Sequence, residues 1–508
     1  MSSTQNLGDL VPRGVAPDRI ALIALDESLR ETRYTYAELD ARANALARGL
    51  LRRGIASGQR VAVLAANCAD YLVVLLGALR AGIVVVPVNY KFPKRLSDFV
   101  LSDSGAVLAF ADARHRSALP ANLPAVEFGK EGADGFDALL DEGPFDAKVP
   151  DAHELAIILY TSGSTGVPKG VRLSHESHLW ILRTRLAGQD LSGERYLVAA
   201  PLYHMNALAL CQLAVAGGST IILLRQFKAA DYIGAASRYR ATWLTSVPPM
   251  MAMVLREKEE LARADLSSVR VVRMGSAPVS ESLFEGIAGI MPQARIINSY
   301  GTTEGGPVTF GPHPHGKPQP RMSVGYAHPQ VQLRLTDAQG KIAAHGVLQI
   351  RSPGLMLGYH NRPDLAAAVT ADGYYITGDI FRQDEDGFYY FVGRNDDMFV
   401  CGGENIFPGE VEAVLEAHPA VQQACVVPLE DDIKGHKPVA FIVPTPGHLI
   451  DEDAIRRYAL EHAPAYQHPR RVWFLDSLPL ASTGKVDRSL LKRSAQRQSI
   501  SQTSPGAS

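Results

Sequence analysis

The chain has little excess charge and few cysteines. Its 508 residues include 51 Lys and Arg against 53 Asp and Glu, a formal net charge of −2. A nearly neutral chain provides no extended positive field for nucleic acid, so any phosphate group must be bound at a local site. The four cysteines, Cys68, Cys211, Cys401 and Cys425, form no CxxC pair. This spacing indicates free thiols in a reducing cytoplasm.

Long apolar segments are also missing. The apolar run at residues 71–79 is too short to span a bilayer. Residues 1–18 are polar and lack the apolar region of a secretory signal. We therefore expect a cytoplasmic protein without a membrane span. A length of 508 residues with 46% hydrophobic residues predicts a globular protein of two or more domains.

The first part of the chain alternates between helix and strand patterns. Thr35 and Glu38 form a capping box, a start signal for a helix, and apolar residues then recur at helical spacing until Gly54. A strand at 60–65, a helix at 69–80 and a strand at 83–88 make a βαβ unit, which is typical of a parallel sheet covered by helices. The same patterns predict later strands at 220–224, 242–246, 269–274 and 295–298, with helices near 229–239 and 281–290.

The pattern changes after about Gly325. Alternating strands at 331–335, 346–351 and 387–392 predict a small β-rich subdomain. Mixed helix and strand patterns from Glu410 onward predict a compact α+β domain. The fold class is therefore α/β, with the β-rich and α+β parts toward the C-terminus.

A loop rich in hydroxyls and glycines follows an apolar strand at 155–160. It reads Thr161-Ser-Gly-Ser-Thr-Gly-Val-Pro-Lys169-Gly170. Glycines let backbone N–H groups turn toward an anion, hydroxyls add donors and a lysine adds charge. A surface loop would explain the small residues but not a lysine directly after Pro168. No Gly-Lys-Ser/Thr occurs here, so the loop is not a Walker A motif, but it predicts a polyanion site.

This loop resembles the signature loop of the adenylate-forming superfamily, which holds acyl-CoA synthetases, peptide-synthetase adenylation domains and luciferase. The chain is most similar to bacterial aryl- or acyl-CoA ligases such as 4-chlorobenzoate-CoA ligase. Asn298-Ser-Tyr300-Gly-Thr-Thr-Glu304 matches the YGxTE element of the family. The resemblance implies that Tyr300 lies near adenine, Thr303 contacts the α-phosphate and Glu304 helps to hold Mg²⁺. ATP reacts as its magnesium complex, and this hard cation prefers oxygen ligands.

Three further segments match the family in its order. Gly275-Ser-Ala-Pro278 falls where the family contacts adenine. Tyr375-Ile-Thr-Gly-Asp379 matches the element whose Asp binds the ribose hydroxyls, and Gly393-Arg394-Asn-Asp396-Asp397 matches the element that contains the ribose-contacting Arg and the hinge Asp. The resemblance implies an ATP site formed by Thr161, Ser162, Gly163, Ser164, Thr165, Gly166, Lys169, Ser276, Ala277, Pro278, Tyr300, Gly301, Thr302, Asp379 and Arg394.

The segment Pro479-Leu-Ala-Ser-Thr-Gly484-Lys485 matches the terminal motif of the family. The resemblance implies two steps: an acid and ATP give an acyl-adenylate and pyrophosphate, and coenzyme A then gives acyl-CoA and AMP. Charge that gathers on the phosphate would be stabilised by Lys485 and Thr303. For the second step the C-terminal domain would rotate about Asp396, which would bring Gly402, Gly403 and Glu404 to the CoA entrance.

The resemblance also implies the domain plan. We expect a large N-terminal domain of two stacked βα sheets with a small β-barrel subdomain, followed by a small mobile α+β C-terminal domain. The expected boundaries are a disordered or loosely attached N-terminus at 1–16, the N-terminal domain at 17–395 with its β-rich part at about 325–395, the C-terminal domain at 396–493 and a disordered tail at 494–508.

The acid pocket is less clearly marked. His204 lies in an element that gates the pocket in the family, although a core histidine is an alternative interpretation. No acidic residue follows it to grip an amino group, which disfavours amino acids. Arg270 and Arg273 could pair with a second carboxylate, but arginines near strand ends are more often structural. The expected lining, mostly small or apolar, is His204, Met205, Asn206, Ser246, Ser299, Gly306 and Pro307.

The predicted function is an ATP-dependent ligase for an uncharged fatty or aromatic acid, with ATP, Mg²⁺ and coenzyme A. The catalytic residues would be Lys485, Thr303, Glu304 and His204. Alternatives are loading of a carrier protein, a short dicarboxylic acid as substrate, a luciferase-like oxygenase, and a binding module without catalysis. Lysine acetyltransferase and deacetylase enzymes acting on Lys485 are possible partners, nucleic acid is not expected, and a monomer or homodimer is expected.

Overall fold

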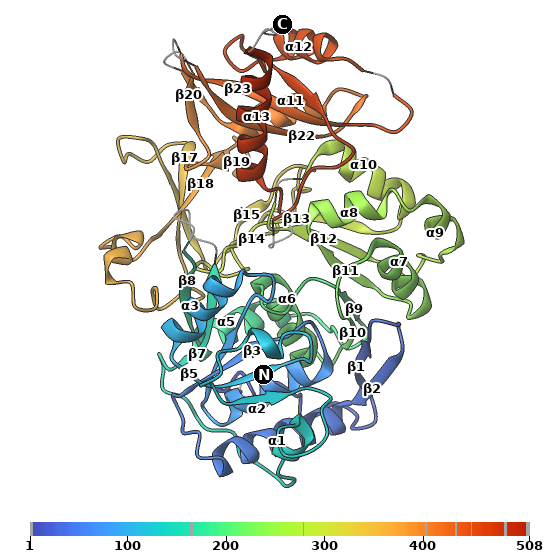
Figure 1. Cartoon of the computed structure of the whole chain (residues 1–508), viewed down its shortest axis with the longest axis vertical. Helices are drawn as coiled ribbons and strands as arrows, with labels where there is room; N and C mark the ends of the chain where they lie inside the picture. The colour runs from blue at the N-terminus through green and yellow to red at the C-terminus, as the bar shows by residue number, and fades with distance from the viewer. Residues whose placement is uncertain are drawn as a thin grey trace, which may run out of the picture.

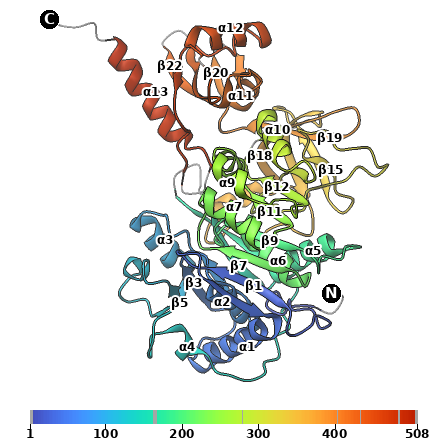
Figure 2. The same ribbon diagram turned by 90° about the vertical axis from the view of Figure 1, so that its right-hand side faces the viewer.

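The computed structural model describes residues 4–161, 167–277, 279–401, 404–431, 434–448, 450–481 and 485–503 (Figures 1 and 2). Two sheets and their helices form a large N-terminal region, and the C-terminal region lies at the opposite end of the molecule (Figure 1). Within the described ranges, no helix combines the length and the apolar character needed to cross a bilayer.

The first sheet has six strands in the order β6-β5-β3-β4-β7-β8, and only the β7–β8 pair is antiparallel. The predicted capping box is confirmed, because Thr35 Oγ1 accepts from the Glu38 N–H and the Thr35 N–H donates to Glu38 at 2.7 Å. The elements are β3 Arg60–Leu64, β4 Val84–Pro87, β5 Ala106–Ala111, β6 Ala125–Glu127, β7 Leu155–Thr161 and β8 Lys169–Ser174, with α1 Tyr36–Arg52, α2 Ala69–Arg80, α3 Lys94–Ser104 and α4 Phe136–Leu139.

The second sheet has seven strands in the order β13-β12-β11-β9-β10-β1-β2, and only the β1–β2 pair is antiparallel. The predicted strands and helices of this region are confirmed to within two residues at their ends. The elements are β1 Ile20–Leu25, β2 Glu31–Thr35, β9 Arg195–Val198, β10 Thr220–Leu224, β11 Trp243–Ser246, β12 Val271–Gly275 and β13 Arg295–Ser299, with α5 His175–Leu186, α6 Met205–Ala216, α7 Ala229–Arg238, α8 Pro248–Val254, α9 Lys258–Arg263 and α10 Glu281–Ile290.

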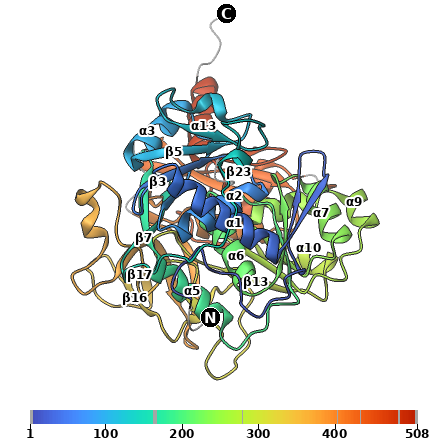
Figure 3. The ribbon, with the colours of Figure 1, turned by 90° about the horizontal axis from the view of Figure 1, so that it is seen from below.

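The two sheets are stacked in five layers. Successive strand residues point to opposite faces, so a sheet buried on both faces needs helices on both. One face of each sheet shares a core with α1, α2, α5 and α6 (Figure 3). The other face of the seven-stranded sheet packs on α7, α8 and α10, and the other face of the six-stranded sheet packs beside α3. The predicted pair of stacked βα sheets is confirmed.

A six-stranded antiparallel sheet follows in the order β14-β15-β19-β18-β17-β16. Its end strands do not pair with each other in the described part of the chain, so the sheet is open and the prediction of a barrel is wrong. The edge strand β14 has two residues, which is too short to pair along both of its sides. The strands are β14 Phe310–Gly311, β15 Gly325–Ala327, β16 Gln332–Thr336, β17 His345–Arg351, β18 Tyr375–Gln383 and β19 Phe388–Arg394.

The C-terminal region contains the sheet β21-β20-β23-β22, with β24 parallel to β23. The prediction of a disordered tail from 494 is wrong for residues 494–503, which belong to α13 (Figure 2). Leu491 and Ala495, one turn apart, anchor this otherwise polar helix in the core. The elements are β20 Phe399–Cys401, β21 Glu404–Ile406, β22 Val421–Asp431, β23 Gly435–Pro444 and β24 Val472–Phe474, with α11 Pro408–Glu416, α12 Glu452–His462 and α13 Arg488–Thr503.

The N-terminal segment is firmly attached from residue 4, contrary to the prediction. Leu7 and Leu10 are buried in the core. The Asn6 side chain donates to the Leu79 carbonyl at 2.8 Å, and the Arg80 guanidinium donates to the Gly8 carbonyl at 2.7 Å. Two buried leucines and a few bonds to the backbone are enough to attach this segment, so its polar composition did not predict its attachment.

Candidate active site

The predicted phosphate loop joins β7 to β8 at the top of the first sheet. Thr161 ends β7 and pairs with Lys169, the first residue of β8. Residues 162–166, which include Ser162, Gly163, Ser164, Thr165 and Gly166, lie outside the described residues. The strand bonds fix Thr161 and Lys169 on either side of the loop, as a polyanion site would require.

Tyr359 joins the phosphate loop to Glu304, and sequence analysis missed it. The Lys169 ammonium lies 5.2 Å from the centre of the Tyr359 ring. The Tyr359 hydroxyl donates to Glu304 Oε1 at 2.9 Å, and burial together with this carboxylate raises the pKa of Tyr359. The tyrosine therefore stays protonated and keeps donating. Tyr359 comes from a segment that bonds to the edge of β8, where Gly170 accepts from the His360 N–H at 2.7 Å, and no motif marks it.

Glu304 has the surroundings expected for a ligand of a metal that arrives with a nucleotide. Its residue is 9% exposed, and the second carboxylate oxygen has no hydrogen-bond partner in the described ranges. No group of three or more His, Cys, Asp or Glu side chains suited to a metal occurs among the described residues. Mg²⁺ commonly uses one or two carboxylates together with substrate phosphates. The residues fit a Mg²⁺–ATP complex rather than a resident ion held by protein ligands alone.

Tyr300, Asp379 and Arg394 form a charged group on β18, β19 and the end of β13. The Tyr300 hydroxyl donates to Asp379 Oδ2 at 2.5 Å, and Arg394 pairs with Asp379 Oδ1 at 3.1 Å. Burial raises the pKa of Asp379, while Arg394 and Tyr300 oppose that shift. Burial likewise disfavours the charge of Arg394, but the carboxylates of Asp379 and Asp396 raise its pKa above the ordinary value. Tyr300 and Arg394 therefore hold the Asp379 carboxylate in place as a hydrogen-bond acceptor.

The ends of β12 and β13 approach each other closely beside this group. A side chain at Gly275 would place its Cβ 2.7 Å from Ser299 Oγ, so only glycine fits there. The next residue, Ser276, has φ = +67°, a left-handed conformation that is uncommon for a residue with a side chain and typical of functional sites. Ala277 is half-buried next to it, and Pro278 lies outside the described residues.

The turn after β13 is equally tight. A Cβ at Gly301 would lie 2.9 Å from the Cα of Pro307, and the Gly305 N–H donates to the Thr302 hydroxyl at 2.8 Å. The Thr303 side chain is half-buried and is not engaged by these bonds. The turn thus presents Thr303 and Glu304 next to the Asp379 group.

Lys485 reaches this site from the C-terminal region. Its carbonyl accepts from the Ala481 N–H at 2.7 Å, which ties Lys485 to Ala481. The residue is exposed, yet the surrounding protein partly desolvates its ammonium and lowers the pKa of Lys485, against the pull of the Asp379 and Glu304 carboxylates. The structure therefore places the predicted lysine within electrostatic range of the predicted ATP site.

Asp396 lies in the turn after β19, between the two regions. Its carboxylate is 48% exposed and pairs with Arg394 at 3.2 Å. Among the described residues few hydrogen bonds cross the junction: one is from the Arg256 guanidinium to Gln422 in β22 at 3.1 Å. Glu404 lies exposed on the β20–β21 hairpin, and none of the contacts described above involves it. Gly402 and Gly403 lie outside the described residues.

The predicted acid-pocket residues are only partly brought together. Ser299, Gly306 and Pro307 lie beside the β12–β13 edge, and the α5 side chain Ile181 comes within 3.1 Å of a Cβ added at Gly306. Ser246 pairs in register with Met274, which packs in the core of α7, α8 and α10, so its side chain faces away from Ser299.

His204 lies directly before α6 and packs its ring against Tyr203, with ring centres 4.5 Å apart. Its Nε2 is buried without a partner in the described residues. Burial, with the charges of Lys485 and Lys91, lowers the pKa of His204 to about 4, so the imidazole is neutral at neutral pH. Met205 and Asn206 follow in the first turn of α6.

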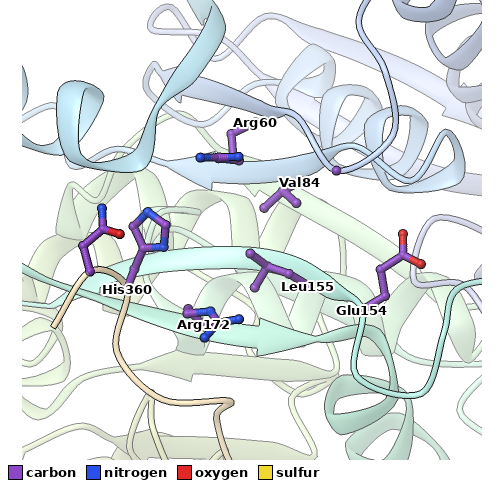
Figure 4. Close-up of a pocket in the computed structure, with 8 residues that line it drawn as sticks. Arg60, Val84, Glu154, Leu155, Arg172 and His360 are labelled. Atoms are coloured by element: carbon purple, nitrogen blue, oxygen red, sulfur yellow. The ribbon is translucent and has the colours of Figure 1, made fainter. Parts of the chain in front are cut away.

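A cavity of about 310 Å³ lies near the beginnings of β3, β4 and β7 and contains none of the predicted site residues (Figure 4). Arg60 borders it from above, His360 from the left and Arg172 from below in this view. His360 also bonds the Asp103 carbonyl at 3.1 Å, and Arg60 bonds the Ser104 carbonyl at 2.8 Å. The His360 bond attaches the 358–361 segment to α3, and backbone bonds with Arg172 and Gly170 attach it to β8, so the cavity borders the segment that holds Tyr359.

Comparisons with known proteins agree with this geometry. The AMP-binding enzyme family matches residues 13–360, and the AMP-binding enzyme C-terminal domain matches residues 410–485. The chain is 34% identical over 472 residues to a feruloyl-CoA synthase from Amycolatopsis sp, which covers 91% of this chain and 94% of that protein.

Two other matches illustrate the range of acceptors and ligands. A fatty acid–[acyl-carrier-protein] ligase from Streptomyces coeruleorubidus is 31% identical over 475 residues, covering 90% of this chain and 91% of that one. A crystal structure of an anthranilate CoA ligase in complex with anthranoyl-AMP superposes with a TM-score of 0.87 at 25% identity, covering 97% of this chain and 98% of that chain.

Proposed function

Because the chain belongs to the AMP-binding enzyme family, we propose that it is an AMP-forming acid–CoA ligase in which the residues described above perform both half-reactions. The observation that carries this proposal is the convergence of Glu304, Asp379 and Lys485 on one site. They lie up to 181 positions apart, from Glu304 to Lys485, and their charges interact. Such preorganised charges are what phosphoryl chemistry needs, since it depends mainly on positioning and electrostatics.

In the first half-reaction a carboxylate oxygen of the acid bonds to the α-phosphorus of ATP, and the bond to pyrophosphate breaks. Asp379 and Arg394 would hold the ribose, and Lys169 would bind phosphate oxygens. Lys485 and the Thr303 hydroxyl would stabilise the charge that develops on the α-phosphate. Glu304 would hold Mg²⁺, which supplies charge neutralisation to the phosphates when bound.

In the second half-reaction the sulfur of coenzyme A bonds to the acyl carbon, and AMP leaves with the electron pair of the broken C–O bond. The thiol proton passes to solvent. Lys485 must leave the site to admit the thiol, so the C-terminal region would turn about Asp396 and present Glu404. The small number of hydrogen bonds that cross the junction in the described ranges supports such a rotation.

The hinge assignment has a direct test. Asp396→Pro should fix the backbone, spare pyrophosphate release and abolish acyl-CoA formation, whereas Asp396→Ala should retain both steps. Both steps are measured separately, by pyrophosphate release without coenzyme A and by thioester formation with it. Equal loss of the two steps in Asp396→Pro would contradict the hinge. Absence of pyrophosphate release by the unmodified chain with every acid of a broad panel would contradict the ligase itself.

Loading of a carrier protein is a second candidate, because one relative has that activity in its name. The rates of thioester formation with free coenzyme A and with a phosphopantetheine-bearing carrier protein decide between the two acceptors.

Cytoplasmic location and acetylation of Lys485 are further parts of the proposal. All four cysteines are free thiols, which supports a reducing compartment. Lys485 is exposed, which supports access by a modifying enzyme, and acetylation would remove its charge. Mass spectrometry of the protein from its host would detect the modified lysine, and only unmodified Lys485 across growth conditions would count against it.

A further inference from the structure

Two arginines lie in the layer between the seven-stranded sheet and helices α5 and α6, with no counter-charge among the described residues. Arg273 lies in β12 and Arg185 lies in the last turn of α5. Both are half-buried, and neither guanidinium has a hydrogen-bond or ion-pair partner among the residues that the structure describes. Arginines that are withdrawn from water are normally paired, because an unpaired charge there is costly.

The strand register places Arg273 on the same face of the sheet as the acid-binding edge. Arg273 and Gly275 are two residues apart, so their side-chain positions share one face. Gly275 pairs with Ser299 in β13, next to the turn that holds Gly306. Arg273 therefore lies about 7 Å further along the strand than the Gly275–Ser299 pair. Tyr196, on the same face, belongs to the core shared with α5 and α6.

Helix α5 brings the second arginine to the same level. Ile181 faces Gly306, with its Cδ1 3.1 Å from a Cβ added there. Arg185 follows one turn later on the same side of the helix, about 6 Å along its axis. Figure 2 shows α5 and α6 beside β9. The two guanidiniums are near enough to repel each other, and burial together with this repulsion lowers the pKa of Arg273 to about 9.

Polar atoms without a partner among the described residues lie on the same face of the sheet as Arg273. The Tyr196 hydroxyl, the Trp243 indole N–H and the Thr245 hydroxyl are buried without a partner in the described part of the chain. Thr245 pairs in register with Arg273, and Trp243 pairs with Tyr196, so all of them lie on this face. Each can donate a hydrogen bond, and the indole can only donate. Buried polar groups are nearly always satisfied, so such a group of donors indicates a missing acceptor.

Neighbouring arginines behave differently. Arg270 is 57% exposed and pairs with Glu194 at 2.7 Å, and Arg195 donates to the Tyr239 carbonyl at 2.6 Å. These two are structural, as strand-end arginines usually are. The contrast separates Arg273 from Arg270, which the sequence treats alike.

We propose that Arg185 and Arg273 bind a second carboxylate of the acid, at the end remote from the carboxylate that is activated, so that the substrate class is a dicarboxylic acid with a body about one aromatic ring long. This proposal rests on the proposed function, since it concerns the acid of that reaction. Two cations and three neutral donors match a carboxylate, which accepts several hydrogen bonds and neutralises the repulsion between the guanidiniums. The substrate class differs from the uncharged acid expected from the lining residues.

The test compares acids that differ only in the remote charge. Pyrophosphate release is measured with terephthalate and its monomethyl ester, and with adipate and its monomethyl ester. We expect the unmodified chain to prefer each diacid over its half-ester by about 10- to 100-fold in kcat/KM, as lost charge-assisted hydrogen bonds imply. Arg273→Met and Arg185→Met should each lower kcat/KM for the diacids by at least tenfold and leave or raise that for the half-esters. Arg270→Met is the matched control and should change neither.

The outcomes separate this inference from the proposed function. The carboxylate site would be overturned if kcat/KM for the half-esters equalled or exceeded that for the diacids and if Arg273→Met and Arg185→Met left this ratio unchanged. The proposed ligase function would not be affected by that result. Turnover of a half-ester by each variant shows that the variant is folded and that its ATP site works. A chain that releases pyrophosphate with no acid at all would instead contradict the ligase.

Discussion

The proposed ATP site and the proposed acid-binding face differ in how their polar groups are satisfied. The acid face is the side of β9, β11, β12 and β13 that packs against α5, together with α5 itself. In the ATP site, Asp379 is bonded by Tyr300 and Arg394, and Glu304 is bonded by Tyr359. On the acid face, Arg185 and Arg273 have no such partners in the described ranges.

The difference shows which part of each site is preorganised. Groups that hold one another in place before the ligand arrives need no reorganisation during the reaction, which suits the ATP chemistry that is common to every acid. Groups left unsatisfied gain most from one particular ligand, which suits selection among acids. Substitutions in the ATP site should therefore lower activity with all acids equally, whereas substitutions on the acid face should change the ranking of acids.

The largest effect is expected for Lys485→Ala. Removing a preorganised charge that acts on the transition state typically costs about 100- to 1000-fold in rate. Pyrophosphate release should fall by that factor with every acid. The conversion of a supplied acyl-adenylate to acyl-CoA should change by less than about threefold, since the lysine leaves for that step. Lys341→Ala, at an exposed position, is the control. A loss of activity that varies strongly among acids would contradict the assignment of Lys485 to the acid-independent ATP site.

A smaller, equally acid-independent effect is expected for Asp379→Asn. The substitution keeps the size of the side chain but removes the charge that pairs with Arg394. Loss of charge-assisted bonds should raise the KM for ATP by about 10- to 100-fold without altering the ranking of acids. Asp372→Asn, in a surface pair with Arg334, should leave the KM unchanged. An effect confined to kcat would speak against ribose binding by Asp379.

Sequence patterns predicted most helices and strands and named the residues of the proposed ATP site, because both depend on neighbouring residues. The capping box at Thr35 and the helical spacing in α2 are local signals, and so are the motifs that contain Glu304 and Asp379. Tyr359 carries no motif, and only the bonding of its segment to the edge of β8 brings it to Glu304.

The sequence named Arg270 and Arg273 together but could not separate them or find Arg185, because the proposed acid face depends on register and on helix orientation. Arg270 and Arg273 are three residues apart and have the same chemistry, but one meets Glu194 and the other faces α5. Arg185 lies in a helix with no clear apolar side, so no pattern marked its inward position. Ser246 was assigned to the pocket by its place in the sequence, whereas strand alternation turns its side chain to the other face.

The pH dependence of the first half-reaction tests whether the charge of Lys485 acts equally with every acid. Burial lowers the pKa of Lys485, so its charge is present below that pKa and is lost as pH rises through it. Pyrophosphate release should therefore decline at alkaline pH with an apparent pKa below that of free lysine, by about tenfold for each unit beyond it. Lys485→Arg should move the decline to higher pH, because a guanidinium stays charged there. The same apparent pKa is expected with every acid; an alkaline limb unmoved by Lys485→Arg would assign it to another group.

The smallest effect is expected on the acid face at Ile181→Ala. Ile181 lies against Gly306 and Gly354, one turn before Arg185, and its removal should admit a bulkier acid without disturbing the proposed ATP site. Removing a few methyl and methylene groups from a pocket changes the ratio of kcat/KM for two acids by only about 3- to 10-fold, because part of the freed space is filled by the larger acid. We expect the kcat/KM ratio of 2-methylterephthalate to terephthalate to rise by that factor, while the KM for ATP stays constant. A constant ratio with a raised KM for ATP would place Ile181 at the nucleotide site. Arg185, one turn further along α5, would then lie beyond the nucleotide and not beyond the acid, which would contradict the proposed acid face.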